Sequence, residues 1–111
     1  MTDQNAKDEI VVLVTVSRED EAVSIARALV ETKLAACANI INNVRSIYEW
    51  QGKIEDDSEL LMVIKTRRSI FSDLAAKVTE LHSYDVPEII ALPIVEGSPE
   101  YLKWLNASTG K

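Results

Sequence analysis

Two long segments with strand character, joined by a short glycine-containing turn, constrain the fold of this chain most strongly. Between Leu34 and Trp50, side chains alternate between two faces, and Ser58–Thr66 (SELLMVIKT) returns with strand composition. The letters WQGK between them suit a tight turn that needs a glycine. A long antiparallel β-hairpin is therefore predicted, with irregularities at the Asn42-Asn43 pair and at the acidic stretch Glu55–Asp57.

One strand and one helix are predicted before this hairpin. Ile10–Val16 (IVVLVTV) is a continuous, mostly β-branched run, typical of a strand that is covered on both faces. Ser17, three residues before Asp20, resembles the capping box of a helix start. Apolar residues then recur at helical spacing through Lys33, which predicts the first helix.

After the hairpin the chain repeats this plan in the order helix, then strand. Apolar residues at helical spacing predict a helix over residues 71–81. Ile89–Val95 (IIALPIV) predicts a fourth strand, in which Pro93 suits an edge position. Ser98 followed by Pro99 is a typical N-cap and first helical residue, and a short helix is expected through Asn106.

The resulting order, β-α-β-β-α-β with a terminal helix, predicts an α+β fold of the ferredoxin-like type. Four antiparallel strands carry two helices on one face in this plan. A chain of 111 residues suits one domain. We expect a flexible N-terminus over residues 1–9, a single domain over 10–107 and a tail over 108–111.

The predicted hairpin is too long for a compact domain of this size. Strands of about 14 residues at about 3.4 Å per residue would span roughly 48 Å. A compact chain of this length has a radius of gyration of about 13 Å. A projecting arm carrying Ile47, Tyr48, Trp50 and Ile54 would expose apolar surface and unpaired strand edges. The sequence therefore predicts a homo-oligomer with the hairpin at its interface.

Composition excludes several classes of protein. Hydrophobic residues make up 47% of the chain and the formal net charge is −6, which suits a globular protein and not a nucleic-acid binder. One cysteine allows no internal disulfide, and neither a signal peptide nor an apolar run of membrane-spanning length is present. A cytoplasmic protein without nucleic-acid or membrane partners is expected.

Several motifs together make the chain resemble the CutA family of divalent-cation tolerance proteins over roughly residues 10–107. They occur in the family's order and spacing: KLAACANII (33–41), YEWQGKIE (48–55), ELLMVIKT (59–66), HSYDVPEI (82–89) and YLKWLN (101–106). The resemblance implies a homotrimer of ferredoxin-like subunits, similar in architecture to PII signalling proteins with ligand clefts between subunits. It also implies a role in tolerance to copper and other divalent metals.

The resemblance also points to a copper site of which this chain keeps one residue. Family members credited with copper binding use a cysteine near the end of the first strand and two adjacent histidines. Those positions are occupied here by Val14, Leu81 and His82.

His82, the only histidine, is nevertheless the candidate metal ligand. A metal site needs three or four suitable ligands, and Tyr84, Asp85, Glu88 and Cys37 are the other candidates. The alternative is a loop histidine that hydrogen-bonds a carboxylate or a backbone carbonyl. No cofactor is required by any motif, and copper or another divalent cation is the candidate ion.

A small anionic ligand in a cleft between subunits is the alternative function. Lys65 and Arg67 lie where a strand runs into a helix start, and they share a face if that strand continues far enough. The remaining candidates for this ligand cleft are Cys37, Tyr48, Trp50, Tyr84 and Glu88. Cys37 and the three aromatic residues have a plainer interpretation as packing or interface residues. For the basic residues the plainer interpretation is ordinary solvation, or pairing with Glu88 or Asp85.

No catalytic constellation is recognisable. Cys37 and His82 could be drawn as nucleophile and base, but no third group to orient them is evident. The chain contains no nucleophile elbow, phosphate-binding loop or zinc-protease motif. We expect a protein that is not an enzyme.

Overall fold

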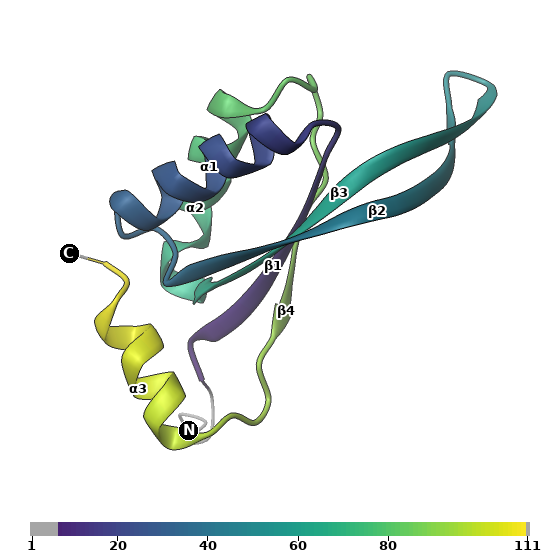
Figure 1. Ribbon diagram of the computed structural model, residues 1–111. Helices are drawn as coiled ribbons and strands as arrows, with labels where there is room; N and C mark the ends of the chain where they lie inside the picture. Colours follow the sequence, from purple (N-terminus) through teal and green to yellow (C-terminus); the bar gives the residue numbers. More distant parts are fainter. Residues whose placement is uncertain (1–6, 111) are drawn as a thin grey trace.

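The computed structural model describes residues 7–110, which form one antiparallel sheet with three helices (Figure 1). The strand order is β2-β3-β1-β4. The elements are β1 (Glu9–Val16), α1 (Glu19–Glu31), β2 (Cys37–Trp50), β3 (Lys53–Arg67), a 3-10 turn (Arg68–Ile70), α2 (Phe71–Leu81), β4 (Ile89–Pro93) and α3 (Pro99–Ala107). The expected α+β class and the expected order of elements are confirmed.

Most local signals were interpreted correctly, with several corrections. β4 ends at Pro93, whereas a strand to Val95 was expected, and α1 ends at Glu31, whereas a helix through Lys33 was expected. The register of β2 and β3 shifts between Ile41 and Val44, as expected for a bulge, and Ser98 accepts a hydrogen bond from the backbone N–H of Tyr101. The N-cap of α1 is Arg18, whereas Ser17 was expected, and no side chain caps this helix. The irregularity expected at Glu55–Asp57 is absent, because all three residues pair regularly with β2.

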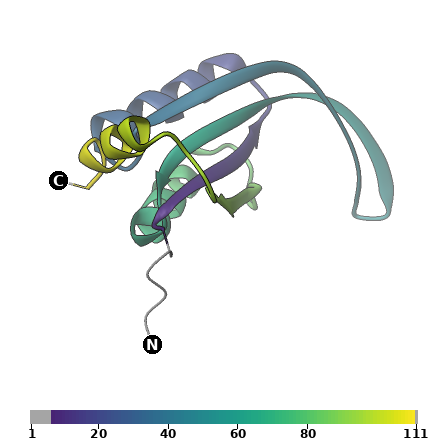
Figure 2. The ribbon, with the colours of Figure 1, turned by 90° about the horizontal axis from the view of Figure 1, so that it is seen from below.

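The β2–β3 hairpin extends well beyond the rest of the molecule. Figure 2 shows it curving away from the helices before the chain turns back. The molecule measures 47 × 30 × 23 Å, and its radius of gyration of 15.0 Å exceeds the value of about 13 Å for a compact chain. Ile47, Trp50 and Ile54 are more than half exposed along this arm.

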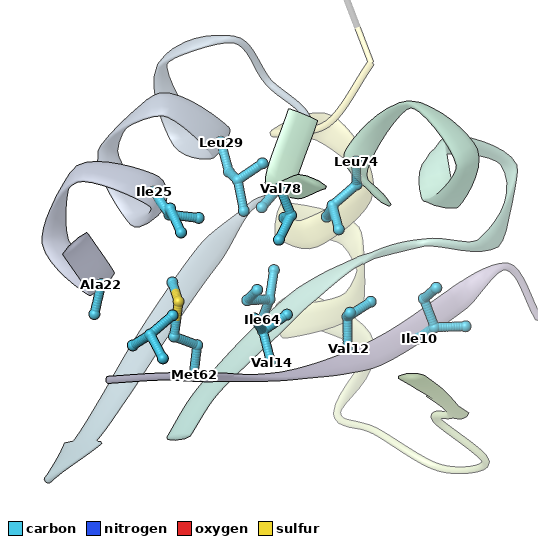
Figure 3. Packing of buried hydrophobic residues seen from close by; sticks show 12 residues of the cluster. Ile10, Val12, Val14, Ala22, Ile25, Leu29, Met62, Ile64, Leu74 and Val78 are labelled. Atoms are coloured by element: carbon cyan, nitrogen blue, oxygen red, sulfur yellow. The ribbon is translucent and has the colours of Figure 1, made fainter. Parts of the chain in front are cut away.

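The hydrophobic core lies between the sheet and the helices α1 and α2, which run side by side over one face (Figures 1 and 3). In Figure 3 the side chains of Ile25 and Leu74 point from the helices toward Val14 and Ile64 on the strands. The buried cluster comprises Ile10, Val12, Val14, Ala22, Ile25, Leu29, Ala35, Met62, Ile64, Leu74 and Val78, together with Val16. Alternate residues of β1 and β3 thus form the helix-facing side of the sheet.

The opposite side of the sheet is largely uncovered, and we call it the open face. It carries the other alternate residues: Val11 and Leu13 of β1, Leu61 and Val63 of β3, Ile41 of β2, and Ile90 and Leu92 of β4. Ile41, Ile90 and Leu92 are each about half exposed, at 48%, 49% and 50%. The β1 run was expected to be covered on both faces, but within one chain helices α1 and α2 cover only one.

Helix α3 covers one end of the open face. Leu105 of this helix is fully buried, and Asn106 donates a hydrogen bond of 2.6 Å to the Glu9 carboxylate. Arg67 donates to the side chain and to the carbonyl of Thr109. Regular structure therefore begins one residue before the expected domain start at residue 10, and tertiary contacts continue past residue 107. Residues 1–6 and residue 111 of the expected termini lie outside the described residues.

Among residues 7–110, none of the helices is long and apolar enough to span a membrane.

Candidate functional site

Five of the seven residues predicted to line a ligand cleft lie on the open face. Lys65 and Arg67 share this face because β3 continues to Arg67, and Cys37 is the pairing partner of Lys65. Tyr48 and Trp50 follow on the same face of β2 toward the hairpin tip. Eleven residues of strand separate Cys37 from Tyr48, which is roughly 35 Å. One small ligand therefore cannot contact both ends within a single chain.

A group of polar side chains gathers at the α3 end of the open face, and we call it the basal cluster: Cys37, Asn39, Lys65 and Tyr101. The Tyr101 hydroxyl lies 3.8 Å from the Cys37 sulfur. The Lys65 ammonium group donates to the side-chain oxygen of Asn39, its diagonal neighbour on β2. Burial and the neighbouring Cys37 raise the pKa of Tyr101. The β2–β3 hairpin and the distant helix α3 thus supply a cation and several hydrogen-bond donors.

Beside the basal cluster lies a buried carboxylate that is only partly satisfied. Glu9 is 8% exposed, and its Oε2 accepts the hydrogen bond from Asn106. The second oxygen, Oε1, has no hydrogen-bond partner in the part of the chain that the structure describes. Arg67 is the cross-strand neighbour of Glu9, but its guanidinium group is engaged by Thr109.

Two tyrosine–carboxylate pairs lie farther along, at the root of the hairpin. Tyr84 donates a hydrogen bond of 2.7 Å to Glu59, whose side chain is buried. Tyr48 donates one of 2.6 Å to Asp57 in a more exposed setting. Burial and the Glu59 carboxylate raise the pKa of Tyr84, and the hydrogen bond to Asp57 raises the pKa of Tyr48 to about 12.

His82 is buried, and both of its ring nitrogens are engaged by the main chain. Nε2 lies 2.8 Å from the carbonyl oxygen of Thr15, and Nδ1 accepts a hydrogen bond of 3.0 Å from the backbone N–H of Tyr84. A carbonyl can only accept and a backbone N–H can only donate, so the proton belongs on Nε2. The Glu21 carboxylate, 3.4 Å from Nδ1, accepts from the backbone and hydroxyl of Ser83. The histidine therefore links β1, α1 and the loop after α2.

The surroundings of His82 do not form a metal centre within one chain. Residues 7–110 contain no group of three or more His, Cys, Asp or Glu side chains arranged to hold a metal ion. The candidate ligands Asp85 and Glu88 are exposed, and a metal bound by His82 would have to displace one of its two main-chain hydrogen bonds.

Several residues of these clusters were not singled out from the sequence. Tyr101 is 64 residues from Cys37 along the chain, and no local pattern predicts the contact between them. Asn39, Glu21 and Glu59 carried no distinguishing pattern. The one available signal for Asn39 and Glu59 was strand alternation, which places them on the same face as Lys65 once the register is known.

The chain matches a family model described as CutA1 divalent ion tolerance protein over residues 10–108. The divalent-cation tolerance protein CutA of Thermus thermophilus is 54% identical over 102 residues, covering 92% of this chain and 99% of the relative. The chloroplastic protein CutA of Arabidopsis thaliana is 51% identical over 100 residues. That match covers 90% of this chain but 55% of the plant protein, so this chain spans about half the length of the plant relative.

Solved structures show the same fold. A CutA1 crystal structure from Oryza sativa superposes with a TM-score of 0.91 at 44% identity, covering 97% of this chain and 99% of the rice chain. The divalent cation tolerance protein of Thermus thermophilus gives a TM-score of 0.90 at 54% identity, covering 92% of this chain and 99% of that one.

Proposed function

Because this chain belongs to the CutA1 divalent ion tolerance family, we propose that it acts in tolerance to divalent cations as a homotrimer without enzymatic activity. The proposed location is the cytoplasm, where the single cysteine would remain reduced. Copper is the candidate ion.

The uncovered apolar side of the sheet is the main observation that supports the proposed trimer. An antiparallel sheet can leave one face to water, but such a face is normally polar. Here Ile41 on β2 and Ile90 and Leu92 on β4 leave both outer strands of the sheet with exposed apolar side chains, next to the exposed hairpin residues. Large exposed apolar patches mark interaction sites. Identical copies that pack through their open faces would cover these exposed apolar side chains.

The ion site in this proposal is assembled between subunits. A single chain offers no suitable ligand group among its described residues, and His82 is held by main-chain hydrogen bonds. A side chain that lies close to a threefold axis is present in three copies around that axis. An ion on the axis would therefore receive three equivalent ligands.

Sedimentation and metal titration test this proposal together. We expect a trimer at micromolar concentration, and saturable Cu(I) or Cu(II) binding at fewer than one ion per chain that survives His82→Ala. Cells overproducing the chain should also tolerate more copper than cells with an empty vector. A folded monomer, or growth on copper that is unchanged by the protein, would refute the proposal. Binding of one ion per chain that His82→Ala abolishes would place the metal within a subunit.

A second candidate function is that of a PII-like sensor or carrier of a small anionic molecule. The observation that favours it is the basal cluster, which puts the Lys65 cation beside polar donors on a face that we expect to meet another subunit. In a screen of nucleotides and organic acids, a rise in melting temperature that Lys65→Ala removes would support this function. The absence of any stabilising compound would count against it.

A further inference from the structure

We propose that the basal cluster is a carboxylate-binding site, with Lys65 as its charged anchor and Asn39 and Tyr101 as neutral donors. This inference rests on the second candidate function, and it names both the residues and the chemical class of the ligand. The carboxylate belongs either to a free organic acid or to an acidic side chain of a neighbouring copy.

Lys65 lacks a counter-charge in the part of its own chain that the structure describes. No Asp or Glu oxygen of residues 7–110 lies within 4 Å of its ammonium group, whereas Arg45 and Lys77 each have such a partner. The ammonium group instead donates to the neutral amide oxygen of Asn39. Lys65 is already half-buried, with the apolar Val63 next to it on the same face of β3.

Assembly through the open face would change the surroundings of the Lys65 ammonium group. Covering the open face with another copy would remove the ammonium group from much of its water. A charge that loses water is costly unless it is paired and hydrogen-bonded. The cluster should therefore contain an anion wherever its face is covered.

The basal cluster has an excess of hydrogen-bond donors over acceptors. An ammonium group has three N–H donors, of which Asn39 uses one, and the Asn39 amide nitrogen adds two more. Among residues 7–110, the Tyr101 hydroxyl lies within reach of only a weak sulfur acceptor. A carboxylate offers two oxygens that accept from several donors at once, whereas a metal cation would be repelled by Lys65.

The aromatic neighbour indicates a carboxylate with an apolar body. Trp104 lies against Tyr101 with ring centroids 5.4 Å apart, and the two residues are 46% and 42% exposed. Small-molecule sites combine such apolar walls with a few polar anchors. In a neighbouring copy, the carboxylates of Glu55 and Asp57 on the projecting hairpin would have the same chemistry.

Lys65→Met and Lys65→Arg, compared with the wild type, test this site. Methionine keeps the size of the side chain and removes its charge, and arginine keeps the charge. The readout is melting temperature with and without succinate at constant ionic strength, with native mass spectrometry of protein taken directly from cells.

Two results would support the site and distinguish its sources. If succinate raises the melting temperature of the wild type and of Lys65→Arg, but not of Lys65→Met, the ligand is a free acid, and three added masses per trimer should accompany it. If succinate has no effect, but Lys65→Met melts at least about 4 °C below the wild type, the partner is a carboxylate of another copy. Glu55→Gln combined with Asp57→Asn should then remove most of that difference.

A Lys65→Met variant that melts at or above the melting temperature of the wild type would overturn the proposal. An unpaired buried charge is destabilising, so its removal in Lys65→Met would leave the melting temperature unchanged or raise it. An equal succinate shift in all three proteins would indicate a non-specific salt effect and would likewise exclude a free-acid site. Sedimentation in the same buffers shows separately whether the trimer forms, so loss of the trimer and loss of the anion site are distinguishable.

Discussion

At the scale of single residues, the same chemical pair occurs twice at the root of the hairpin, in two different environments. Tyr84 donates to Glu59, which is 5% exposed, and Tyr48 donates to Asp57, which is exposed to solvent. Water can replace the hydroxyl of Tyr48 but reaches the buried Glu59 carboxylate poorly. The energetic value of the two hydrogen bonds should therefore differ, although their lengths are nearly equal.

Tyr84→Phe should lower the free energy of unfolding by about 1–3 kcal/mol, because it leaves the buried Glu59 oxygen without its donor. Tyr48→Phe is the comparison and should cost less, since Asp57 is exposed in the single chain whereas Glu59 is buried there. Chemical denaturation of both variants gives the comparison. Equal losses of unfolding free energy in the two variants would show that burial of the carboxylate does not decide how much the hydrogen bond stabilises the protein.

At the scale of elements, the hairpin turn is the most sharply defined feature. Trp50 pairs with Lys53, so Gln51 and Gly52 alone form the turn, and both have positive φ angles of 52° and 81°. Two-residue turns of this kind match the twist of the flanking strands and favour Asn-Gly.

Gly52→Ala should therefore cost about 1 kcal/mol of stability through backbone conformation alone, since a Cβ at this position would meet no atom within 4 Å. Gln51→Asn should stabilise the protein by a few tenths of a kcal/mol, roughly, because asparagine adopts positive φ more readily. Thermal denaturation of the two variants tests the pair. A neutral Gly52→Ala would mean that the turn relaxes to another type.

Elements were predicted well from the sequence wherever a local pattern decides them. The turn at Gly52, the bulge near Asn43 and the cap at Ser98 each depend on a few neighbouring residues. The N-cap of α1 was wrong by one residue, because no side-chain hydrogen bond holds that helix end and backbone geometry alone sets it. The basal cluster was only half predicted, because Tyr101 reaches Cys37 through the packing of α3, which strand alternation does not report.

At the scale of the whole molecule, β1 shows why a single chain leaves apolar surface uncovered. Its residues are apolar on both faces, and only the face toward α1 and α2 is covered in one chain, except where α3 packs at one end. The projecting hairpin adds the exposed side chains of Trp50 and Ile54 to this uncovered apolar surface. The open face and the hairpin together form an apolar surface, which we expect to bind another copy. The solvent-exposed side of the helices is not expected to do so.

That difference can be tested with two substitutions at similarly exposed apolar residues. Ile90 on the open face is 49% exposed and Val30 on α1 is 43% exposed in the single chain. Ile90→Lys should convert the oligomer to monomers in sedimentation velocity at micromolar concentration, because three unpaired ammonium groups would be buried in the proposed interface. Val30→Lys should leave the oligomer intact, since lysine on an exposed helix surface remains hydrated. Both variants should keep the far-ultraviolet circular dichroism of the wild type, because neither residue belongs to the buried cluster between sheet and helices. An oligomer that tolerates Ile90→Lys but not Val30→Lys would place the interface on the helices and contradict assembly through the open face.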